Sequence, residues 1–498
     1  MKDYSFGNYI CALRQGHGLS QFQLGALVGV TDKAVSKWEN GSAKPKLSTC
    51  IRLASVLDIP IDELLSCKGH SSTTARKDFD HMNQKLWKEA YNRLTIYGDI
   101  PPAVCWSRLA TEEQALRDTN AIQIFSILGK LEEEARKMSS VFYVAGTISS
   151  SFVAWLFGGT KVNPLPPHYR CPKCGKTEFV KNTADGFDLP PKTCTCGAEF
   201  LRDGHNIPFE GYCRNKQRGP DVEIRVSEAF KPIAVSIIKS FYENTATVIP
   251  INLTPDENSI DIDRLLVYEN GDPAISTGND IRCMTSEQCW NWQKTYPSSV
   301  SFTLVPSTLA DNIQSAQKKL GTNIVDSHFL YTPQMLKHLY QKRLQDHPIT
   351  AKLLPSEESL SFSLLLKLDA IIHSTGSWTM VSQGDQRSIN EDILLCEGRT
   401  SFREIPVFRE DILNDISIAL RKNGITDHGL ALQMMRDVGR RGKYKFKGMP
   451  IVIEEIIKSL DLPEWYPDYL KRVAYLFPKG HCIAALIAEV AYEWVCSD

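Results

Sequence analysis

The segment from Ser20 to Gly41 constrains the fold of this chain most, because it places helix start and stop signals at close spacing. Ser20 stands where a helix N-cap is expected, and Gly29 can supply the positive φ that follows a short helix. Thr31 then caps a second segment, which Asn40 and Gly41 close. Apolar residues recur between these signals at helical spacing: Leu24, Leu27, Val28, Val35 and Trp38. The sequence therefore predicts two short helices joined by a tight turn.

Such a pair of helices suits recognition of DNA, because the second helix can enter the major groove with its first turn against the base edges. Residues 8–65 resemble the Cro-like, XRE-type helix-turn-helix family through the elements S-Q-x-x-L, V-T-x-x-A-V-S-K-W-E-N-G and D-E-L-L. The resemblance implies seven positions that face DNA: Gln21, Gln23, Thr31, Lys33, Ala34, Ser36 and Lys37. The competing interpretation is a helical bundle used only for protein contacts.

The charge balance gives no global signal for nucleic acid binding. The chain holds 57 Lys and Arg against 58 Asp and Glu, a formal net charge of −1, whereas a strongly basic chain would suggest a polyanionic partner. Residues 1–70 hold six Lys and two Arg against six acidic residues, a local net charge of +2. This small surplus predicts modest affinity of one copy for double-stranded DNA, which a homodimer or a second DNA contact would raise.

The length of 498 residues corresponds to about three or four domains. Hydrophobic residues make up 42% and charged residues 23%, which excludes a disordered, collagen-like or coiled-coil chain. The N-terminus has no apolar signal core, so we expect a cytoplasmic protein. The uncharged stretch 141–159 approaches membrane-spanning length, but its serines, threonine and glycines favour a buried loop and helix without membrane contact.

Two close pairs of cysteines indicate a metal site. The C-x2-C and C-x-C pairs, each on a tight turn, can supply tetrahedral sulfur ligands to zinc, and four thiolates leave no open position, which is typical of a structural site. These four candidate ligands are Cys171, Cys174, Cys194 and Cys196. Since the second pair is tighter than usual, Cys213 or His205 could substitute as a ligand. Four free thiols in a loop are the alternative interpretation.

A second resemblance covers residues 88–245, which look like the active-site core of a bacterial replicative DNA polymerase III alpha subunit of the PolC type. The matching pieces are Tyr97-Gly98, the G-x3-S-S-F-V-A run at 146–154, VNPLPPHYRCPKCGKTEF at 162–179, GFDLP at 186–190, DGHNIPFE at 203–210 and PDVEIRVS at 220–227. In that family the cysteine-rich insert is a zinc ribbon, which supports a zinc site here.

Further matching pieces lie toward the C-terminus. The segments FREDI at 408–412, MMRDVGRRGK at 434–443 and residues 462–494 resemble the fingers of that family, and LLLKLD at 364–369 resembles the strand that bears its third catalytic aspartate. The expected fold is multidomain α+β, with an all-α helix-turn-helix domain, a palm of the polymerase-β-like nucleotidyltransferase type that carries a zinc ribbon, and a helical fingers remnant.

The patterns and resemblances together predict six segments along the chain. They are a helix-turn-helix domain at 1–66, a polar linker at 67–84, a palm at 85–245 with the zinc ribbon at 168–202, a divergent thumb-like region at 246–360, a palm return strand and connector at 361–400, and a fingers remnant at 401–498.

The basic segment 436–447 could hold nucleic acid through phosphates or be a solvated loop.

Nucleotidyl transfer requires carboxylates that hold two divalent ions, Mg²⁺ in this case. Asp221 and Glu223 are spaced i, i+2 on one strand and so share a face, and the resemblance lets Asp369 complete the triad. Without the family context, a solvated strand face would be the favoured explanation of the first two acids. The resemblance also implies nucleotide-binding positions at Gly146, Ser150, Ser151, Lys479 and His481.

Departures from the polymerase family argue against processive synthesis. Glu223 replaces an aspartate, and Ala145 stands where the family has an arginine before its glycine. The thumb signature is absent, and the interval between Asp369 and Phe402 is too short for the first part of the fingers. Catalysis depends on close positioning of such groups.

We therefore expect a sequence-specific DNA-binding regulator of transcription or replication in the bacterial nucleoid. Its degenerate polymerase body would serve as a scaffold or partner-binding module, with replication proteins as candidate partners. The alternatives are an active or specialised DNA-directed DNA polymerase, and a structural protein that uses neither chemistry.

Overall fold

The computed structural model divides the chain into two compact units, Met1–His81 and Met82–Asp498. It describes residues 10–11, 13–15, 17, 19–40, 42–45, 47–57, 84–116, 122–212, 222–242, 246–253, 263–269, 282–284, 300–320, 332–346, 360–373, 402, 404–425, 428–439, 443–473 and 476–496. The expected linker at 67–84 lies outside these residues except for Gln84.

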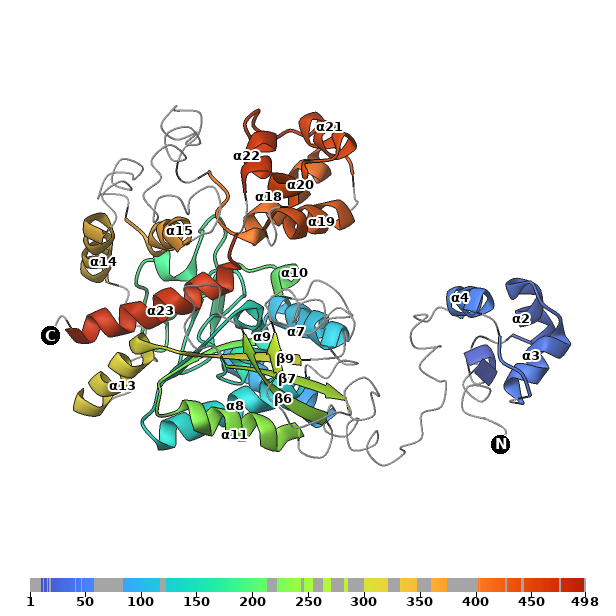
Figure 1. Cartoon of the computed structure of the whole chain (residues 1–498), viewed down its shortest axis with the longest axis horizontal. Coiled ribbons are helices and arrows are strands. Elements are labelled where there is room, and N and C mark those ends of the chain that lie inside the picture. Colours follow the sequence, from blue (N-terminus) through green and yellow to red (C-terminus); the bar gives the residue numbers. More distant parts are fainter. Residues whose placement is uncertain are drawn as a thin grey trace. The chain divides into compact units, whose positions relative to one another are not determined.

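The first unit contains helices α2 (Gln21–Val28), α3 (Asp32–Glu39) and α4 (Leu47–Val56), coloured blue in Figure 1. Leu24, Val28, Val35 and Trp38 are buried in one core, as expected. Leu27, which helical spacing groups with these residues on one apolar face, is instead 56% exposed. Since α2 is apolar on most of its surface while α3 and α4 cover only one side, sequence periodicity could not tell Leu27 from its buried neighbours.

The second unit is built on a six-stranded mixed sheet with the strand order β1-β5-β9-β7-β6-β8. Its strands are β1 (Phe142–Ala145), β5 (Val222–Val226), β6 (Ala246–Leu253), β7 (Asp263–Glu269), β8 (Arg282–Met284) and β9 (Val300–Pro306). Strand β5 pairs antiparallel with β1 and parallel with β9. The edge strand β1 and its neighbour β5 position most of the candidate polymerase residues.

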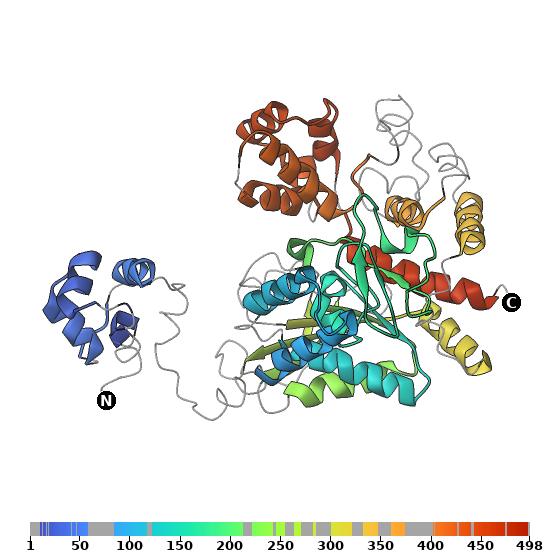
Figure 2. The same cartoon turned by 180° about the vertical axis from the view of Figure 1, so that it is seen from behind.

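Helices cover both faces of this sheet around β1. On one face, Phe142 stacks on Phe230 at the start of α11 (Lys231–Tyr242), which packs beside α8 (Ile122–Lys137), as Figures 1 and 2 show. On the other face, Tyr143 packs against α13 (Thr308–Leu320) and α23 (Lys479–Cys496). Because side chains alternate along a strand, Arg225 and Glu223, which pair with Tyr143 and Ala145, lie on the face covered by α13 and α23.

A smaller three-stranded sheet, β3-β2-β4, is inserted between β1 and β5 in the sequence. It consists of β2 (His168–Arg170), β3 (Thr177–Phe179) and β4 (Leu201–Asp203). The residues between 94 and 212 also form three short helical turns, η1 (Leu94–Tyr97), η2 (Thr147–Ser150) and η3 (Gly186–Asp188). The same stretch of sequence forms helices α7 (Ala103–Leu116), α9 (Phe152–Leu156) and α10 (Phe209–Tyr212). The uncharged stretch 141–159 thus forms β1, η2 and α9, and among the described residues no helix is both long enough and apolar enough to cross a membrane.

The strand expected from LLLKLD at 364–369 is a helix, α15 (Phe362–His373), so this prediction is wrong. Ser361 caps it by accepting a hydrogen bond from the Leu364 amide, and Asp188 of η3 accepts from the amides of Phe362 and Ser363. Most of its side chains are buried, so its sequence shows no helical stripe, and a short apolar run does not distinguish a strand from a buried helix. Helix α14 (Pro333–Asp346) packs beside it.

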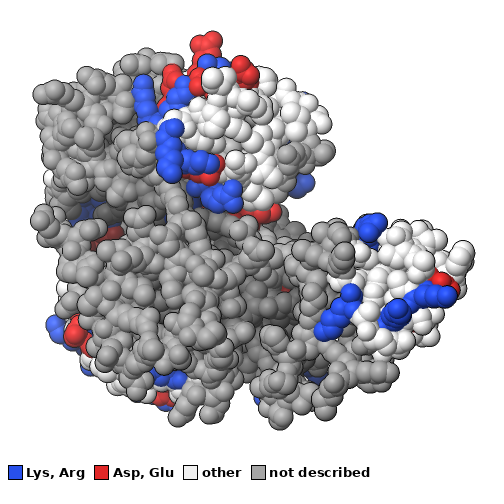
Figure 3. Space-filling view, turned by 45° about the vertical axis from the view of Figure 1, so that its right-hand side comes forward, with Lys and Arg blue, Asp and Glu red and all other residues white. Residues whose placement is uncertain are grey.

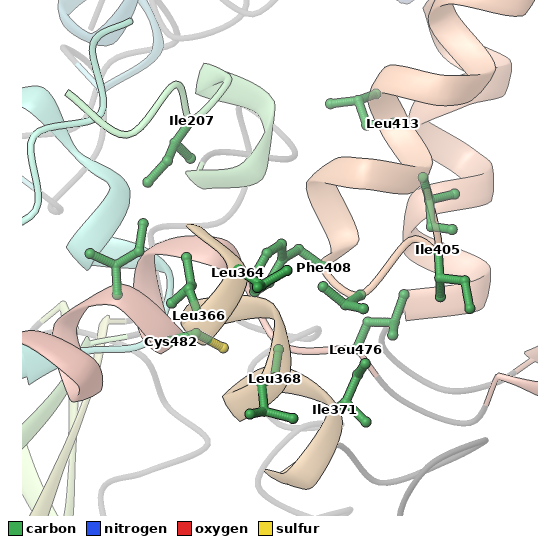
Figure 4. Packing of buried hydrophobic residues seen from close by; sticks show 14 of the residues in the cluster. Ile207, Leu364, Leu366, Leu368, Ile371, Ile405, Phe408, Leu413, Leu476 and Cys482 are labelled. Atoms are coloured by element: carbon green, nitrogen blue, oxygen red, sulfur yellow. The ribbon is translucent and has the colours of Figure 1, made fainter. Parts of the chain in front are cut away.

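Five helices between Arg409 and Arg472 pack into one group, which Figure 1 shows apart from the C-terminal end of α23. They are α18 (Arg409–Lys422), α19 (His428–Gly439), α20 (Lys443–Lys447), α21 (Ile451–Ser459) and α22 (Tyr466–Arg472). These elements agree with the helical structure expected for this region. Figure 4 shows Leu364 and Leu368 of α15 in one apolar cluster with Leu413 of α18 and Cys482 of α23. The helical group therefore shares a core with the helices beside the sheet.

Candidate functional site

The helix-turn-helix candidate is held by local caps at both helix starts. Ser20 Oγ accepts a hydrogen bond from the Gln23 amide at 3.1 Å, and Gln23 Oε1 accepts one from the Ser20 amide at 2.8 Å, which completes a capping box. Gly29 has a φ of 72°, and Thr31 Oγ1 accepts from the Ala34 amide at 3.3 Å. These local interactions fix the turn between α2 and α3.

Four of the seven predicted DNA-facing residues are exposed, namely Gln23, Thr31, Lys33 and Lys37, and the other three, Gln21, Ala34 and Ser36, are half-buried. Figure 3 shows the lysine and arginine side chains of this unit spread over its surface. None of the seven lies in the core of the unit. The surface formed by α2 and the first turns of α3 is therefore available to a ligand.

A charged network behind this surface was not evident from the sequence. Glu39 at the end of α3 forms an ion pair with Arg14, with Nε–Oε1 2.6 Å, and accepts a hydrogen bond from Gln21 Nε2 at 2.7 Å. Burial opposes ionisation of Glu39, but the bonds from Arg14 and Gln21 outweigh it and lower the pKa of this carboxyl. Because Arg14 and Glu39 are 25 residues apart, only the packing of the helices brings them together.

The four predicted zinc ligands lie together. All four Sγ atoms are within 4.8 Å of one another, and the Cys171–Cys196 and Cys174–Cys194 Sγ pairs are 3.4 and 3.7 Å apart. Both distances exceed a disulfide bond, so the four residues are thiols or thiolates. Of the alternative ligands, His205 lies outside this cluster and is hydrogen-bonded through Nδ1 to Asp185 Oδ2. Cys213 lies outside the described residues.

The two cysteine turns and the close approach of the thiols shift the pKa values of Cys171 and Cys174 in opposite directions. Each turn closes with a glycine amide that donates to the first cysteine carbonyl, Gly175 to Cys171 and Gly197 to Cys194. Burial opposes ionisation of Cys171, but the amides of Cys174 and Lys173 outweigh it and lower the pKa of its thiol to about 6. At Cys174 the Lys176 amide lowers the pKa, but the hydrogen bonds with the other three thiols outweigh it and raise the pKa to about 11. Four Sγ atoms within 4.8 Å of one another match the ligand set of a structural tetrahedral zinc ion, which binds thiolates.

The loop predicted to bind nucleotide packs against the first turn of α23. The Gly146 amide donates to His481 Nδ1 at 3.1 Å, and Gly480 lies so close to Ser150 Oγ that a Cβ there would collide with it. Ser150 and Ser151 are fully buried. The structure thus brings Gly146, both serines and the start of α23 together, but leaves both serines without exposed surface.

Ser151 serves the packing of this loop. Its Oγ donates to Glu112 of α7 at 2.7 Å and caps α9 by accepting from the Ala154 amide at 3.1 Å. Glu112 is itself fully buried and forms an ion pair with Arg108, which donates to the carbonyls of Ser150 and Ile207. Because Glu112 comes from a helix far from the loop in sequence, this network was also missed.

Lys479 likewise makes contacts within the protein. Its amide donates to Glu410 of the FREDI segment at 2.9 Å, and its Nζ donates to the His205 carbonyl at 2.6 Å. Within the DGHNIPFE segment, His205 Nδ1 lies 2.8 Å from Asp185 Oδ2, with both side chains fully buried. These matching motifs thus join the small sheet, α18 and α23 into one packed region.

Among the described residues, the carboxylates predicted to hold metal ions do not form one cluster. Asp221 lies outside them, and Glu223 on β5 forms an ion pair with Arg225 at 2.8 Å. Among the side chains that the structure describes, the four cysteines form the one group of three or more metal-binding residues. Glu223 and Asp369 therefore form no two-metal site with any other acid that the structure describes.

Asp369 lies on helix α15 and is part of a buried ion-pair network. Arg343 of α14 donates through Nε to Asp369 Oδ1 at 2.6 Å and also pairs with Glu489 of α23. Although burial opposes its charge, these two carboxylates raise the pKa of Arg343. Asp369 is thereby linked through Arg343 to Glu489 of α23, and its charge adds to the burial that raises the pKa of Cys482 on the same helix.

The basic segment 436–447 is described in part. Arg436 is exposed, and Lys443 pairs with Asp437 at 3.0 Å. Figure 3 shows lysine and arginine side chains mixed with acidic ones over this helical group. Residues 440–442 lie outside the described part of the chain.

Comparison with known families finds one match in each of the two units. The family described as helix-turn-helix matches residues 12–64, and the family described as bacterial DNA polymerase III alpha NTPase domain matches residues 80–294. Both resemblances drawn from the sequence are thereby confirmed.

Relatives carry the description DNA polymerase III PolC-type. Those of Bacillus cereus, Thermotoga maritima and Bacillus subtilis are each 26% identical to this chain, over 468, 479 and 481 residues. The matches cover 80%, 81% and 82% of this chain and 31%, 33% and 32% of the relatives. The chain spans about a third of the length of the curated relatives it matches.

Proposed function

We propose, from a chain that joins a helix-turn-helix domain to a PolC-like polymerase domain, that this protein is a sequence-specific DNA-binding regulator. Its targets are double-stranded DNA sites in the bacterial nucleoid, where it regulates transcription or replication. Its PolC-like body acts as a scaffold or a partner-binding module, with replication proteins as the candidate partners. The observation that carries the proposal is the contrast between an exposed, locally capped helix pair and catalytic candidates that are engaged in internal contacts.

The helix pair supports the DNA-binding part of the proposal. Gln23, Lys33 and Lys37 are exposed on α2 and α3, and the caps at Ser20 and Thr31 set the turn between the helices. Lysine side chains of this kind attract phosphates, and the start of α3 is the segment that would face base edges in a major groove. Because one unit has a small positive surplus, a homodimer on a two-fold site would bind more tightly.

The PolC-like second unit supports the part of the proposal that gives it a scaffold role in place of catalysis. A two-metal mechanism needs carboxylates that are free to coordinate ions, but Asp369 is paired with Arg343 and Glu223 with Arg225. A nucleotide loop needs surface for a triphosphate, but Ser150 is fully buried beneath the first turn of α23, and Ser151 is fully buried against Glu112 of α7. The cysteine cluster fits a structural zinc ion, which would stabilise the small sheet without taking part in catalysis.

Selection of bound sites from random duplexes, followed by footprinting of the full chain, tests the proposal. We expect a defined sequence motif and a protected site. Replacing Lys33 and Lys37 together by glutamate should weaken binding at least about tenfold, because each reversal turns a phosphate-attracting charge into a repelling one. The proposal is wrong if the wild-type chain recovers no motif and binds duplex DNA no better than the double variant does.

A DNA-directed DNA polymerase is the second candidate, favoured by relatives that are described as DNA polymerase III PolC-type. Primer extension with Mg²⁺ and with Mn²⁺ decides between the two. An active enzyme would lose extension in the variants Asp221→Ala and Asp369→Asn, since both acids would hold the ions. We expect no extension above background from the wild-type chain with either ion.

A further inference from the structure

Exposed apolar side chains gather around the start of α7, at the surface of the second unit (Figure 1). Of the eleven large hydrophobic side chains that are exposed among the described residues, four lie between positions 96 and 106. They are Ile96 of η1, Ile100 before α7, and Val104 and Trp106 of α7 itself. Ile100 is 90% exposed and Trp106 is 44% exposed. Apolar residues scattered singly over a surface need no explanation, whereas such a cluster is typical of an interaction site.

Trp106 is held in place from one side. Its ring stacks on the ring of Tyr91, with the ring centroids 5.3 Å apart and 23° between the planes. The Tyr91 hydroxyl donates to Glu113 Oε2 at 2.7 Å, which fixes the tyrosine ring. Because Tyr91 covers one face of the indole, the exposed area of Trp106 lies on the other face and the edge. A tryptophan that is already ordered loses little conformational freedom on binding, and tryptophan is enriched at the centres of protein interfaces.

The exposed side of α7 carries no charge over its first nine residues, Ala103–Thr111. Its exposed positions in this stretch are alanine, valine, tryptophan, serine and threonine. Trp106 and Ala110 are four residues apart and so lie on the same side of the helix. The charged Arg108 is directed inward, where it pairs with the fully buried Glu112. This side of α7 therefore offers apolar contacts without any charged side chain among them.

We propose that the α7 surface, formed by Ile100, Val104, Trp106 and Ala110, binds a second copy of this chain in a two-fold homodimer. In a two-fold contact the same patch is present on both sides, so a charge close to the axis would face its own copy and be repelled. The uncharged stretch 103–111 avoids this repulsion.

The charges beside the α7 surface also suit a second copy. Glu89 and Arg93 pair with each other within the chain. Lys88, one helical turn before Tyr91, and Asp99, next to Ile100, are exposed and have opposite signs. In a two-fold contact, two such positions can pair with each other across the axis, twice over. An apolar centre with a polar margin is the usual composition of a protein interface.

The dimer deepens the proposed function by naming the surface that forms it. Two chains joined through their second units bring two helix-turn-helix domains to one DNA molecule, which strengthens binding to a two-fold site. This consequence rests on the proposed function, whereas the dimer itself does not depend on DNA.

Sedimentation equilibrium of the full chain without DNA tests the proposal. We expect the wild type to approach twice the mass of one chain as its concentration rises. Ala110→Glu should raise the dissociation constant of the dimer at least about tenfold, because it brings a carboxylate into the apolar contact and against its own copy. Trp106→Glu should raise it about 30-fold or more, since it also removes the ordered aromatic side chain.

Ile451→Glu is the matched control, because it makes a similar change at a 75% exposed apolar position on α21, outside the α7 surface. Its dimer should dissociate like that of the wild type. Since Ala110 is exposed, its replacement leaves the core intact, and a circular dichroism spectrum like that of the wild type will show that loss of the dimer is not loss of the fold.

The proposal is wrong if the wild type sediments as a single chain at every concentration that it can reach. It is also wrong if Ala110→Glu and Trp106→Glu dimerise as tightly as the wild type, or if Ile451→Glu weakens the dimer as much as they do. Failure of the proposed function is a separate result. A dimer that Ala110→Glu dissociates supports the α7 surface even in a chain that binds no DNA, and a single chain that selects a DNA motif refutes the dimer alone.

Discussion

In the first unit, four of the seven residues predicted to face DNA are exposed, whereas in the second unit the described side chains predicted for catalysis lie in ion pairs. Gln23 and Lys33 are exposed, and their neighbours Ser20 and Thr31 are satisfied by local backbone bonds. Asp369 is instead neutralised by Arg343 within a buried network. The difference teaches that substitutions should change binding in the first unit and stability in the second.

Removal of zinc should have the largest effect on the second unit. The four cysteines join the turns of the small sheet, and a structural zinc site contributes its binding free energy to folding, of the order of 5 kcal/mol or more. Cys174→Ser should lose about one equivalent of bound zinc and lower the free energy of unfolding. Metal content and denaturant unfolding measure both quantities.

Cys11→Ser is the matched control for the zinc prediction, because Cys11 lies in the first unit and outside the cluster. Its zinc content should equal that of the wild type. Purified wild-type protein without bound zinc would contradict a structural metal and would remove the cluster from the comparison.

Asp369→Ala should cost about 3–5 kcal/mol of unfolding free energy, because it leaves the buried Arg343 with one carboxylate fewer. Glu223→Ala is the matched comparison, since its partner Arg225 is more exposed and the pair is weaker, worth about 1 kcal/mol or less. Denaturant unfolding of the two variants sharpens the contrast between a buried network and a partly solvated pair. If both variants lost the same small amount of unfolding free energy, the ion pair of Asp369 with Arg343 would not contribute to stability as a buried network does.

Asp415 on α18 predicts a pH dependence of stability in the second unit. Burial raises its pKa to about 6, against a hydrogen bond from Tyr466 at 2.8 Å that lowers it. Because the folded state then binds the proton more tightly than the unfolded state, stability should fall as pH rises from about 4 to 7, by about 2 kcal/mol. Asp415→Asn should flatten this part of the pH profile.

Asp461→Asn is the control for the pH prediction, since Asp461 is exposed and pairs with Lys422 at the surface. It should leave the profile unchanged. A wild-type profile that is flat between about pH 4 and 7, or one in which Asp415→Asn changes nothing, would contradict burial of an ionisable Asp415.

Ser20→Ala should have the smallest of these effects, about 1 kcal/mol, and only on the first unit. It removes the Oγ that accepts from the Gln23 amide at 3.1 Å. Thermal unfolding of the full chain should show a lower midpoint for the transition of the first unit, with the second unchanged. Ser42→Ala, at an exposed position without a helix-cap role, should shift neither transition.

Local features of the fold were predictable from the sequence. The caps at Ser20 and Thr31 and the two cysteine turns each depend on residues within a few positions of one another, so short-range rules identified them. The burial of Val35 and Trp38 followed from helical spacing. Leu27 shows the limit of that rule, because which apolar face is covered depends on helices elsewhere in the chain.

Long-range features were not predictable in the same way. The helix α15 was expected to be a strand, because an apolar run buried on nearly all sides has no diagnostic period. The partners of its Asp369 come from α14 and α23, which are 26 residues before it and 120 residues after it in the sequence. No local rule relates residues at such separations, so the burial and pairing of a candidate catalytic acid required the tertiary structure.

The sequence by itself determined the helix pair, the four thiols and the two family resemblances, since each resides in short motifs whose chemistry is local. Only the tertiary structure decided that Glu39 orients Gln21, that Arg343 neutralises Asp369 and that the first turn of α23 covers Ser150. The physical reason is that a side chain's charge, exposure and available donors depend on what packs against it. In this protein those neighbours come from distant parts of the chain.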